Sequence, residues 1–294
     1  MFPIVLAHGI ARFDILRQLV HQELDLPPND LEEKLQYFKN IRTFLNQNGF
    51  PSVSNPNVEF AGSVRDRAAE LKTHVEGVLD QNGADKVHII AHSMGGLDAR
   101  LMIVELGMAD KVASLTTIGT PHYGSPVADR LVGFGGGKLL KTLQEKALKL
   151  DINGVRSLSS EVCREFDEAA RNAEAKNGVF YQVYSSYEAL EEMFSPLLVT
   201  SVIVRAVEGR NDGLVSVTSQ MWKSEIIADD GTRKQVPQHE FPFRADHLNQ
   251  CGWWDAEETP LFSFGENWIE AAREYELKVK NVYLDIAQSV QNIL

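Results

Sequence analysis

The serine at position 93 stands in a context that could make it a nucleophile. Ser93 has Ala91 two positions before it and Gly95 two positions after it. An apolar, β-branched run precedes the serine and a helix-like run follows it, which is the strand, sharp turn and helix that an exposed nucleophile needs. Such a turn imposes strained backbone angles and leaves room only for small neighbours. Gly95 meets that demand, and Ala91 departs only mildly from the glycine of the common pattern.

A serine hydroxyl becomes an effective nucleophile only when a base takes its proton and an acid holds that base in one tautomer. In folds that place a serine nucleophile at a sharp turn between a strand and a helix, the acid and then the histidine follow the serine along the chain. His247, in a polar loop before the last helical region, is the expected base, with His239 as the alternative. Asp212, placed after a late apolar run and before a glycine, is the expected acid. Glu208 is the alternative acid because it leaves the same run.

Attack on a carbonyl produces a negatively charged oxygen, which two backbone N–H donors must stabilise. Each donor lowers the activation barrier by about 3 kcal/mol. Met94, directly after the serine, is expected to supply one donor. Ile10 is expected to supply the other, because Gly9 before it lets the backbone approach closely. His8 is expected to support the substrate site without acting in proton transfer.

The elements that must position these residues alternate between strands and helices. This alternation predicts an α/β fold, a mostly parallel central sheet with helices on both faces, in one domain over residues 1–294. The expected strands cover 3–7, 52–60, 86–91, 112–118, 179–184 and 198–206, a hairpin joins 224–227 to 233–236, and the expected helices cover 30–49, 64–83, 97–106 and the tail from 266.

Between residues 125 and 178 the strand pattern disappears and helical patterns replace it. We interpret this segment as a helical lid or cap inserted into the domain. When such a lid opens, its apolar side chains would line the site for an acyl chain, and the candidates are Leu131, Val132, Phe134, Leu139, Leu140 and Leu143.

The composition excludes several classes of function. The 294 residues are 44% hydrophobic, as expected for a globular protein, and carry a formal net charge of -12, which disfavours nucleic acids and anionic membranes as partners. The two cysteines, Cys163 and Cys251, do not form a disulfide framework. No run approaches the roughly 18 apolar residues of a membrane span. The first residues lack the pattern of a secretory signal, so we expect a cytoplasmic protein or export without such a signal.

Six segments resemble one known family in the order in which they occur: PIVLAHGI, VHIIAHSMGGLDARL, IGTPHYGSPVAD, VRSLSSEVCREF, NDGLVS and ADHLNQ. They resemble the bacterial true lipases of the Proteus and Pseudomonas type. The resemblance implies an α/β-hydrolase core that lacks the first two strands of the standard sheet, a mobile lid, and hydrolysis of triacylglycerols at an oil–water interface. It also implies Ser93, Asp212 and His247 as catalytic residues, with the oxyanion donors on Ile10 and Met94.

The sequence departs from that family at one position that matters for cofactors. Many members bind a structural calcium ion through an Asp two residues after the catalytic histidine, and Asn249 occupies that position here. A neutral amide is a weaker calcium ligand than a carboxylate. We therefore expect no metal and no other cofactor.

Two other functions remain compatible with the sequence, and a third is disfavoured by it. A carboxylesterase for short soluble esters uses the same three side chains, and so does an acyltransferase, in which an alcohol replaces water. A non-catalytic binding protein on this fold would not require an intact set of serine, acid and histidine.

Overall fold

A parallel sheet forms the centre of the molecule. The computed structural model describes residues 1–10, 37–59, 62–133, 152–253 and 267–293. In these residues the main sheet has six strands in the order β2-β1-β3-β4-β5-β8, and every neighbouring pair is parallel. The strands are β1 (Ile4–Ala7), β2 (Val53–Ser54), β3 (Val87–His92), β4 (Val112–Ile118), β5 (Phe180–Ser185) and β8 (Gln238–Glu240).

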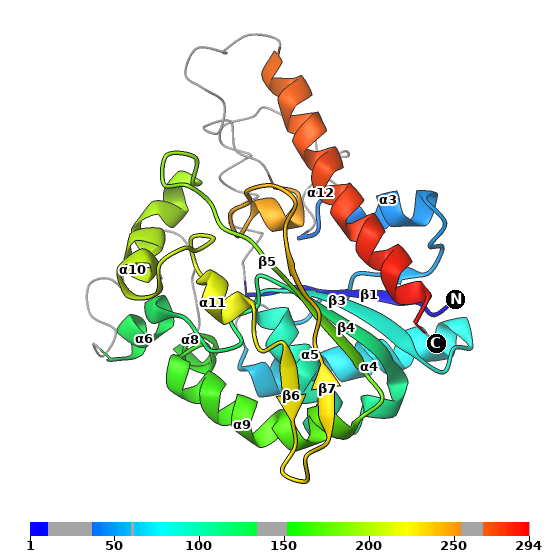
Figure 1. The fold of residues 1–294 in the computed structure, drawn as a ribbon. Helices are drawn as coiled ribbons and strands as arrows, with labels where there is room; N and C mark the ends of the chain where they lie inside the picture. The colour runs from blue at the N-terminus through cyan, green and yellow to red at the C-terminus, as the bar shows by residue number, and fades with distance from the viewer. Residues whose placement is uncertain (11–36, 60–61, 134–151, 254–266, 294) are drawn as a thin grey trace.

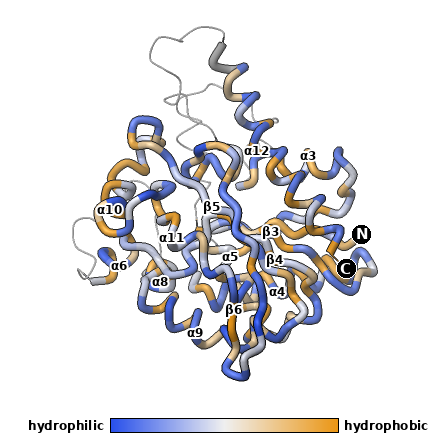
Figure 2. Tube along the Cα trace, viewed as in Figure 1, coloured by the Kyte–Doolittle hydropathy of each residue, from blue (hydrophilic) through white to orange (hydrophobic). Residues whose placement is uncertain are grey.

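Helices cover both faces of this sheet (Figure 1). Side chains alternate along each strand, so Val5 of β1 joins one core cluster and Leu6 joins the other. The first cluster lies under α4 (Val64–Asn82), α5 (Met94–Glu105) and α9 (Ser160–Lys176), and the second under α3 (Ile41–Gln47) and α12 (Asn267–Gln291). Figure 2 shows hydrophobic colours mixed with hydrophilic ones around the strands at the centre of the molecule, and all six residues of β3, two of them histidines, are buried. The predicted mostly parallel sheet flanked by helices is confirmed.

A third, smaller cluster joins helices beside the sheet. It contains side chains of α6 (Pro126–Gly133), α8 (Ile152–Ser157) and α10 (Leu198–Glu208). Leu131 is buried in this cluster, whereas Val132 is 37% exposed. Phe134, Leu139, Leu140 and Leu143 lie outside the described residues. The described parts of 125–178 are helical, and α9 among them packs against α5 as the connection between β4 and β5. A lid role for the segment stays a prediction.

The expected strand at 198–206 is wrong, because these residues form the helix α10. The run LLVTSVIVRA is rich in β-branched residues, which favours a strand locally. Its buried positions, however, include Thr200, Ser201, Ile203 and Val204, a helical spacing that packs one face against α6. Pro196 in the preceding turn of 3-10 helix (Ser195–Leu197) provides the helix start.

Other boundaries also differ from the sequence prediction. Within the described part of 30–49 only α3 is helical, because Asn40 before it adopts a left-handed conformation with φ 55°. The extended stretch near 52–60 contains only the two residues of β2. The hairpin is confirmed as β6 (Glu225–Ile227) paired antiparallel with β7 (Arg233–Gln235). The remaining short elements are α11 (Val217–Gln220) and turns of 3-10 helix at Ala109–Lys111 and Asn249–Cys251.

None of the helices in the described ranges is both long and apolar enough to span a membrane.

Candidate active site

Ser93 occupies the turn between β3 and α5 with a strained backbone. Its φ is 57° and its ψ is -134°, a combination that a non-glycine residue rarely adopts. The backbone N–H of Ser93 donates to the carbonyl oxygen of Ile118 at the end of β4. A Cβ atom at Gly95 would lie 2.5 Å from the carbonyl oxygen of Ala7 in β1. Gly95 is therefore needed for the start of α5 to pack against β1 and hold Ser93 at this turn.

The structure brings Ser93, His247 and Asp212 together. The Nε2 atom of His247 lies 2.9 Å from the Ser93 hydroxyl oxygen, and its Nδ1 atom lies 2.7 Å from Oδ2 of Asp212. All three residues are buried, and they come from the β3–α5 turn, the loop after β8 and the loop between α10 and α11. Because the carboxylate oxygen only accepts, the imidazole proton sits on Nδ1 and leaves Nε2 able to accept the serine proton.

The Asp212 carboxylate is held at both oxygens. Its Oδ1 accepts from the backbone N–H groups of Leu214 and Val215, at 3.0 and 2.8 Å. Its Oδ2 accepts from His247 and from the side-chain amide of Gln250, the latter at 2.9 Å. These four hydrogen bonds hold the carboxylate in one orientation behind His247.

The two alternative residues make other contacts. Glu208, at the end of α10, accepts a hydrogen bond from the hydroxyl of Ser216. His239, in β8, stacks its ring on that of Tyr184 with 4.6 Å between the ring centroids. The acid on Nδ1 of His247 is therefore Asp212 rather than Glu208.

The chain after β1 passes directly against the serine. A Cβ atom at Gly9 would lie 2.5 Å from the Cβ of Ser93, so only glycine fits there. This approach brings the segment that carries the N–H of Ile10 to the serine. Met94 is the first residue of α5, where unpaired N–H groups and the helix dipole favour negative charge. Both predicted donors thus belong to segments that meet at Ser93.

His8 braces the same segment. Its Nδ1 donates to the carbonyl oxygen of Gly9 at 2.9 Å, and its Nε2 accepts from the backbone N–H of Val58 at 3.1 Å. The Gly9 carbonyl belongs to the peptide that carries the Ile10 N–H, so this contact fixes the direction of that donor. Burial, with the nearby charge of Arg67, lowers the pKa of His8 to about 3. A contribution of His8 to the substrate site stays a prediction.

A buried ion pair, which sequence analysis missed, holds the segment from the other side. The Arg67 guanidinium of α4 donates to the carbonyl oxygen of His8 at 2.6 Å and to Oδ2 of Asp98 in α5 at 2.9 Å. Both side chains are fully buried, and burial raises the pKa of Asp98 to about 6. An aspartate within the apolar run of α5 was the available signal, because a buried carboxylate needs a cationic partner.

The loop that carries His247 does not fit a calcium site. The Asn249 amide oxygen accepts from the backbone N–H of Asp246, and its amide nitrogen donates to the carbonyl oxygen of Trp253. The Asp246 carboxylate accepts in turn from backbone N–H groups, including those of Leu248 and Asn249. Within the described ranges, no group of three or more His, Cys, Asp and Glu side chains is placed to hold a metal ion.

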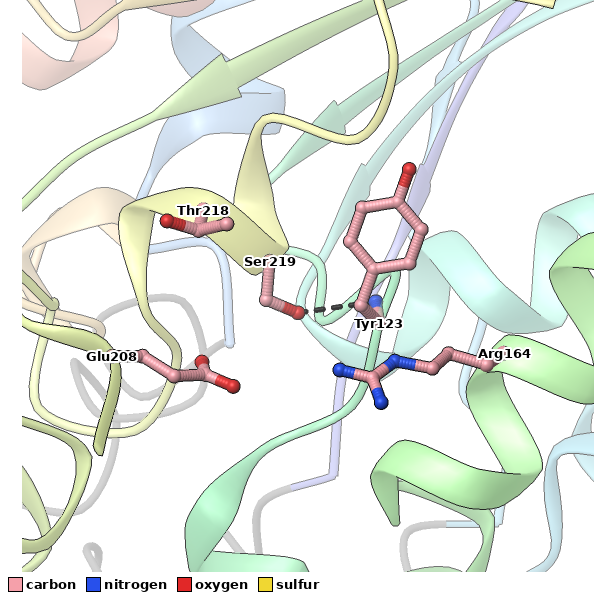
Figure 3. Close-up of a pocket in the computed structure, with 5 residues that line it drawn as sticks. All are labelled: Tyr123, Arg164, Glu208, Thr218 and Ser219. Carbon is pink, nitrogen blue, oxygen red and sulfur yellow. Dashed lines mark hydrogen bonds between the residues drawn. The ribbon is translucent and has the colours of Figure 1, made fainter.

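A cavity of about 290 Å³ lies where α9 and α11 meet the loop after β4 (Figure 3). Within it the Ser219 hydroxyl accepts from the backbone N–H of Tyr123 and donates to the carbonyl oxygen of Gly124. These bonds tie α11 to the loop after β4. The lining residues are Tyr123, Arg164, Glu208, Thr218 and Ser219. None of them is a hydrogen-bond partner of the Ser93 or His247 side chain.

Comparison with known proteins finds lipases among the relatives. The chain is 26% identical over 280 residues to "Triacylglycerol lipase 2" of Saccharomyces cerevisiae, an alignment that covers 85% of this chain and 80% of that protein. It is 28% identical over 284 residues to a "Triacylglycerol lipase" of Vibrio cholerae, covering 85% of this chain and 79% of the relative.

A solved structure shows the fold, and a family model shows the family. A metagenomic carboxyl esterase superposes with a TM-score of 0.62 at 18% identity, covering all of this chain and 76% of that one, which shows an α/β-hydrolase fold. The yeast and Vibrio relatives support the predicted relationship to lipases, whereas the Proteus and Pseudomonas type stays a prediction. The model of the PGAP1-like alpha/beta domain matches residues 60–207, half of the chain and the part that contains Ser93 with its strand and helix, so the chain belongs to the family of PGAP1-like alpha/beta domains.

Proposed function

We propose that this protein is a serine hydrolase that cleaves the carboxylic ester bonds of lipids, as a triacylglycerol lipase of the Proteus and Pseudomonas type. The observation that carries the proposal is the unbroken chain of hydrogen bonds from Ser93 through His247 to Asp212, placed at a turn where the serine has a φ of 57°. A serine held only for packing would not need a buried histidine and carboxylate aligned behind its hydroxyl.

In the proposed reaction His247 takes the Ser93 proton on Nε2 while the serine oxygen attacks the ester carbonyl carbon. The carbonyl oxygen becomes an oxyanion against the N–H groups of Ile10 and Met94. The oxyanion then collapses, the bond to the alcohol breaks, and His247 returns the proton to the leaving alcohol. Water then attacks the acyl carbon while His247 takes its proton, the bond from the Ser93 oxygen to the acyl carbon breaks, and His247 returns the proton to Ser93 as the fatty acid leaves. Asp212 stays ionised throughout and orients the imidazole.

Two observations support a lipid ester as the substrate. The yeast and Vibrio relatives, both named triacylglycerol lipases, align with 85% of this chain. The net charge of -12 favours uncharged lipid aggregates over anionic membranes as the partner surface. The proposed occupant of the site is therefore a neutral acylglycerol at an oil–water interface, with the segment 125–178 as the lid.

The test is the rate of ester hydrolysis of tributyrin and then triolein, each taken through its solubility limit into emulsion, with Ser93→Ala as the blank. We expect hydrolysis of emulsified triolein that requires Ser93. Activity confined to dissolved tributyrin would make the protein a carboxylesterase for short esters. If neither ester is hydrolysed although a fluorophosphonate labels Ser93, the triacylglycerol lipase proposal is overturned, and an acyltransferase or a hydrolase with a narrower range of substrates replaces it.

A further inference from the structure

The side chain of Gln250 is fully buried behind Asp212. It contacts Asp212, which bonds to His247, and it also contacts His92. Its amide nitrogen donates to Oδ2 of Asp212 at 2.9 Å and to the hydroxyl oxygen of Ser186 at 2.6 Å. Its amide oxygen lies 2.9 Å from Nε2 of His92, the residue directly before Ser93. One amide therefore joins the carboxylate of the proposed site to the end of the nucleophile strand.

The partners of Gln250 determine which way its amide points. A carboxylate can only accept, and the Ser186 hydroxyl already donates to the carbonyl oxygen of Ala245 at 2.6 Å. The amide nitrogen must therefore face Asp212 and Ser186, which leaves the amide oxygen facing His92. His92 must then carry its proton on Nε2.

The other nitrogen of His92 is also assigned by its partner. The Tyr37 hydroxyl lies 2.6 Å from Nδ1 of His92, and this nitrogen must accept once Nε2 carries the proton. Burial lowers the pKa of His92 well below its usual range, which keeps the ring neutral. A single sequence of donors and acceptors thus runs from Tyr37 through His92 and Gln250 to Asp212.

Neutral His92 matters because its ring lies against the ring of His247. The ring centroids are 4.5 Å apart, with the planes tilted by 49°. In the proposed reaction His247 becomes positively charged, and a positive charge on His92 at this distance would oppose that step. The contacts that hold His92 in one neutral tautomer therefore favour proton transfer from Ser93.

We infer that Gln250 is a positioning residue for the proposed ester hydrolysis, on which this inference rests: it holds the Asp212 carboxylate in register with His247 and holds His92 as a neutral neighbour. Gln250 touches no reacting atom. It supplies one of the four hydrogen bonds to Asp212, and this bond reaches Oδ2, the oxygen that also bonds to His247.

The test replaces the amide by a thioether of similar length, Gln250→Met. We expect kcat to fall about 10- to 100-fold, as when a partner that orients a reacting group is removed, while KM changes by less than about two-fold. In the substrate-free protein, the low-field proton resonance of the His247 Nδ1–H is expected to shift or broaden, because Asp212 is no longer held at Oδ2.

Gln182→Met is the matched control. Gln182 is also a buried glutamine, and its amide nitrogen donates to the hydroxyl oxygen of Thr116, between β4 and β5. This control loses a buried hydrogen bond without touching Asp212, so its melting temperature is expected to fall while kcat and the His247 resonance stay as in the wild type. A stability loss in Gln250→Met without change in either readout would overturn the inference.

Tyr37→Phe provides a second variant in case Gln250→Met does not fold. It removes the hydroxyl that donates to His92 and keeps the ring that packs on Phe38. A change in the His92 ring resonances together with a several-fold lower kcat is expected, and unchanged values for both would contradict the inference. Ser93-dependent hydrolysis by the wild type is measured first, because its absence refutes the proposed function. The resonances of His92 and His247 need no turnover, so they test the role of Gln250 separately from that function.

Discussion

Asp212 combines four hydrogen bonds on one buried carboxylate, and each constrains what His247 can do. The two backbone donors of the 214–215 turn fix Oδ1, and Gln250 with His247 fixes Oδ2. The imidazole consequently has one allowed tautomer and one orientation. The reactivity that we propose for Ser93 therefore depends on a residue two hydrogen bonds away from its hydroxyl.

Replacing Asp212 by asparagine tests this dependence. The amide presents N–H groups where only an acceptor fits, so His247 is expected to reverse its tautomer and to present a proton to Ser93. We expect kcat to fall about 10⁴-fold, as for an equivalent change in a serine protease, with KM nearly unchanged. Steady-state kinetics on a dissolved ester measure this, with thermal melting to show that the variant is folded. A loss below about ten-fold would mean that Asp212 does not orient the base.

At the scale of elements, α4, α5 and the chain after β1 are joined by the buried pair of Arg67 and Asp98. The pair connects the two helices, and its further bond to the His8 carbonyl extends the connection to the segment with the proposed oxyanion donor. The pair therefore links the stability of the helix layer to the geometry of the site.

Arg67→Met is expected to leave the Asp98 carboxylate buried without its partner. Removing one member of a buried ion pair costs about 3 to 5 kcal/mol of unfolding free energy, whereas replacing both members by apolar groups costs much less. Urea unfolding at neutral pH should therefore show Arg67→Met as the less stable variant, with most of the loss recovered in Arg67→Met combined with Asp98→Leu. Equal loss in both variants would show that the charges contribute nothing specific.

The sequence predicts well those elements whose signals are local. The turn with the proposed nucleophile is predicted by the apolar run before Ser93, the small residues around it and the helix pattern after it. The alternation of strand patterns with helix patterns along the chain predicts the parallel sheet. The helix α10 is mispredicted because its β-branched residues carry a strand preference that packing against α6 overrides. β8 has three residues, too few for a pattern.

Partners brought together only by folding could not be predicted. Gln250 and His92 are 158 positions apart, and Arg67 and His8 are 59 positions apart. Neither the residue type of Gln250 and Arg67 nor their position relative to a motif indicates such a contact. The sequence therefore indicates which side chains could react, while the groups that orient them become visible only in three dimensions.

At the scale of the whole molecule, burial of histidines makes stability depend on pH. Burial is the largest cause of a lowered pKa at His8, His88, His92 and His122. A histidine that stays neutral in the folded state but binds a proton when unfolded stabilises the fold above the unfolded pKa of about 6.5. That stabilisation is lost as the pH falls from 6.5 toward the folded pKa. Asp98 and Asp246, whose pKa values burial raises to about 6, act in the opposite direction.

His88 isolates the histidine effect. Burial, with the N-terminal amino group, lowers its pKa to about 4, and its Nε2 has no hydrogen-bond partner among the described residues. Between pH 6.5 and 4 this group should lower the unfolding free energy by up to about 1.4 kcal/mol per pH unit. The difference between the wild type and His88→Leu in urea unfolding is therefore expected to shift in favour of the variant as the pH falls from 7.5 to 4.5. Parallel pH curves for the two proteins would contradict this assignment.

The sequence separation within the site also determines when the site can exist during protein synthesis. The hydroxyl of Ser93 pairs with a histidine made 154 residues later, and the carboxylate that orients this histidine lies between them. A ribosome-bound chain in which only β1, β3 and β4 have been synthesised thus contains Ser93 but not yet the histidine that would act as its base. In the proposed mechanism the serine therefore gains its base only when the loop after β8 has been synthesised and packs against the sheet.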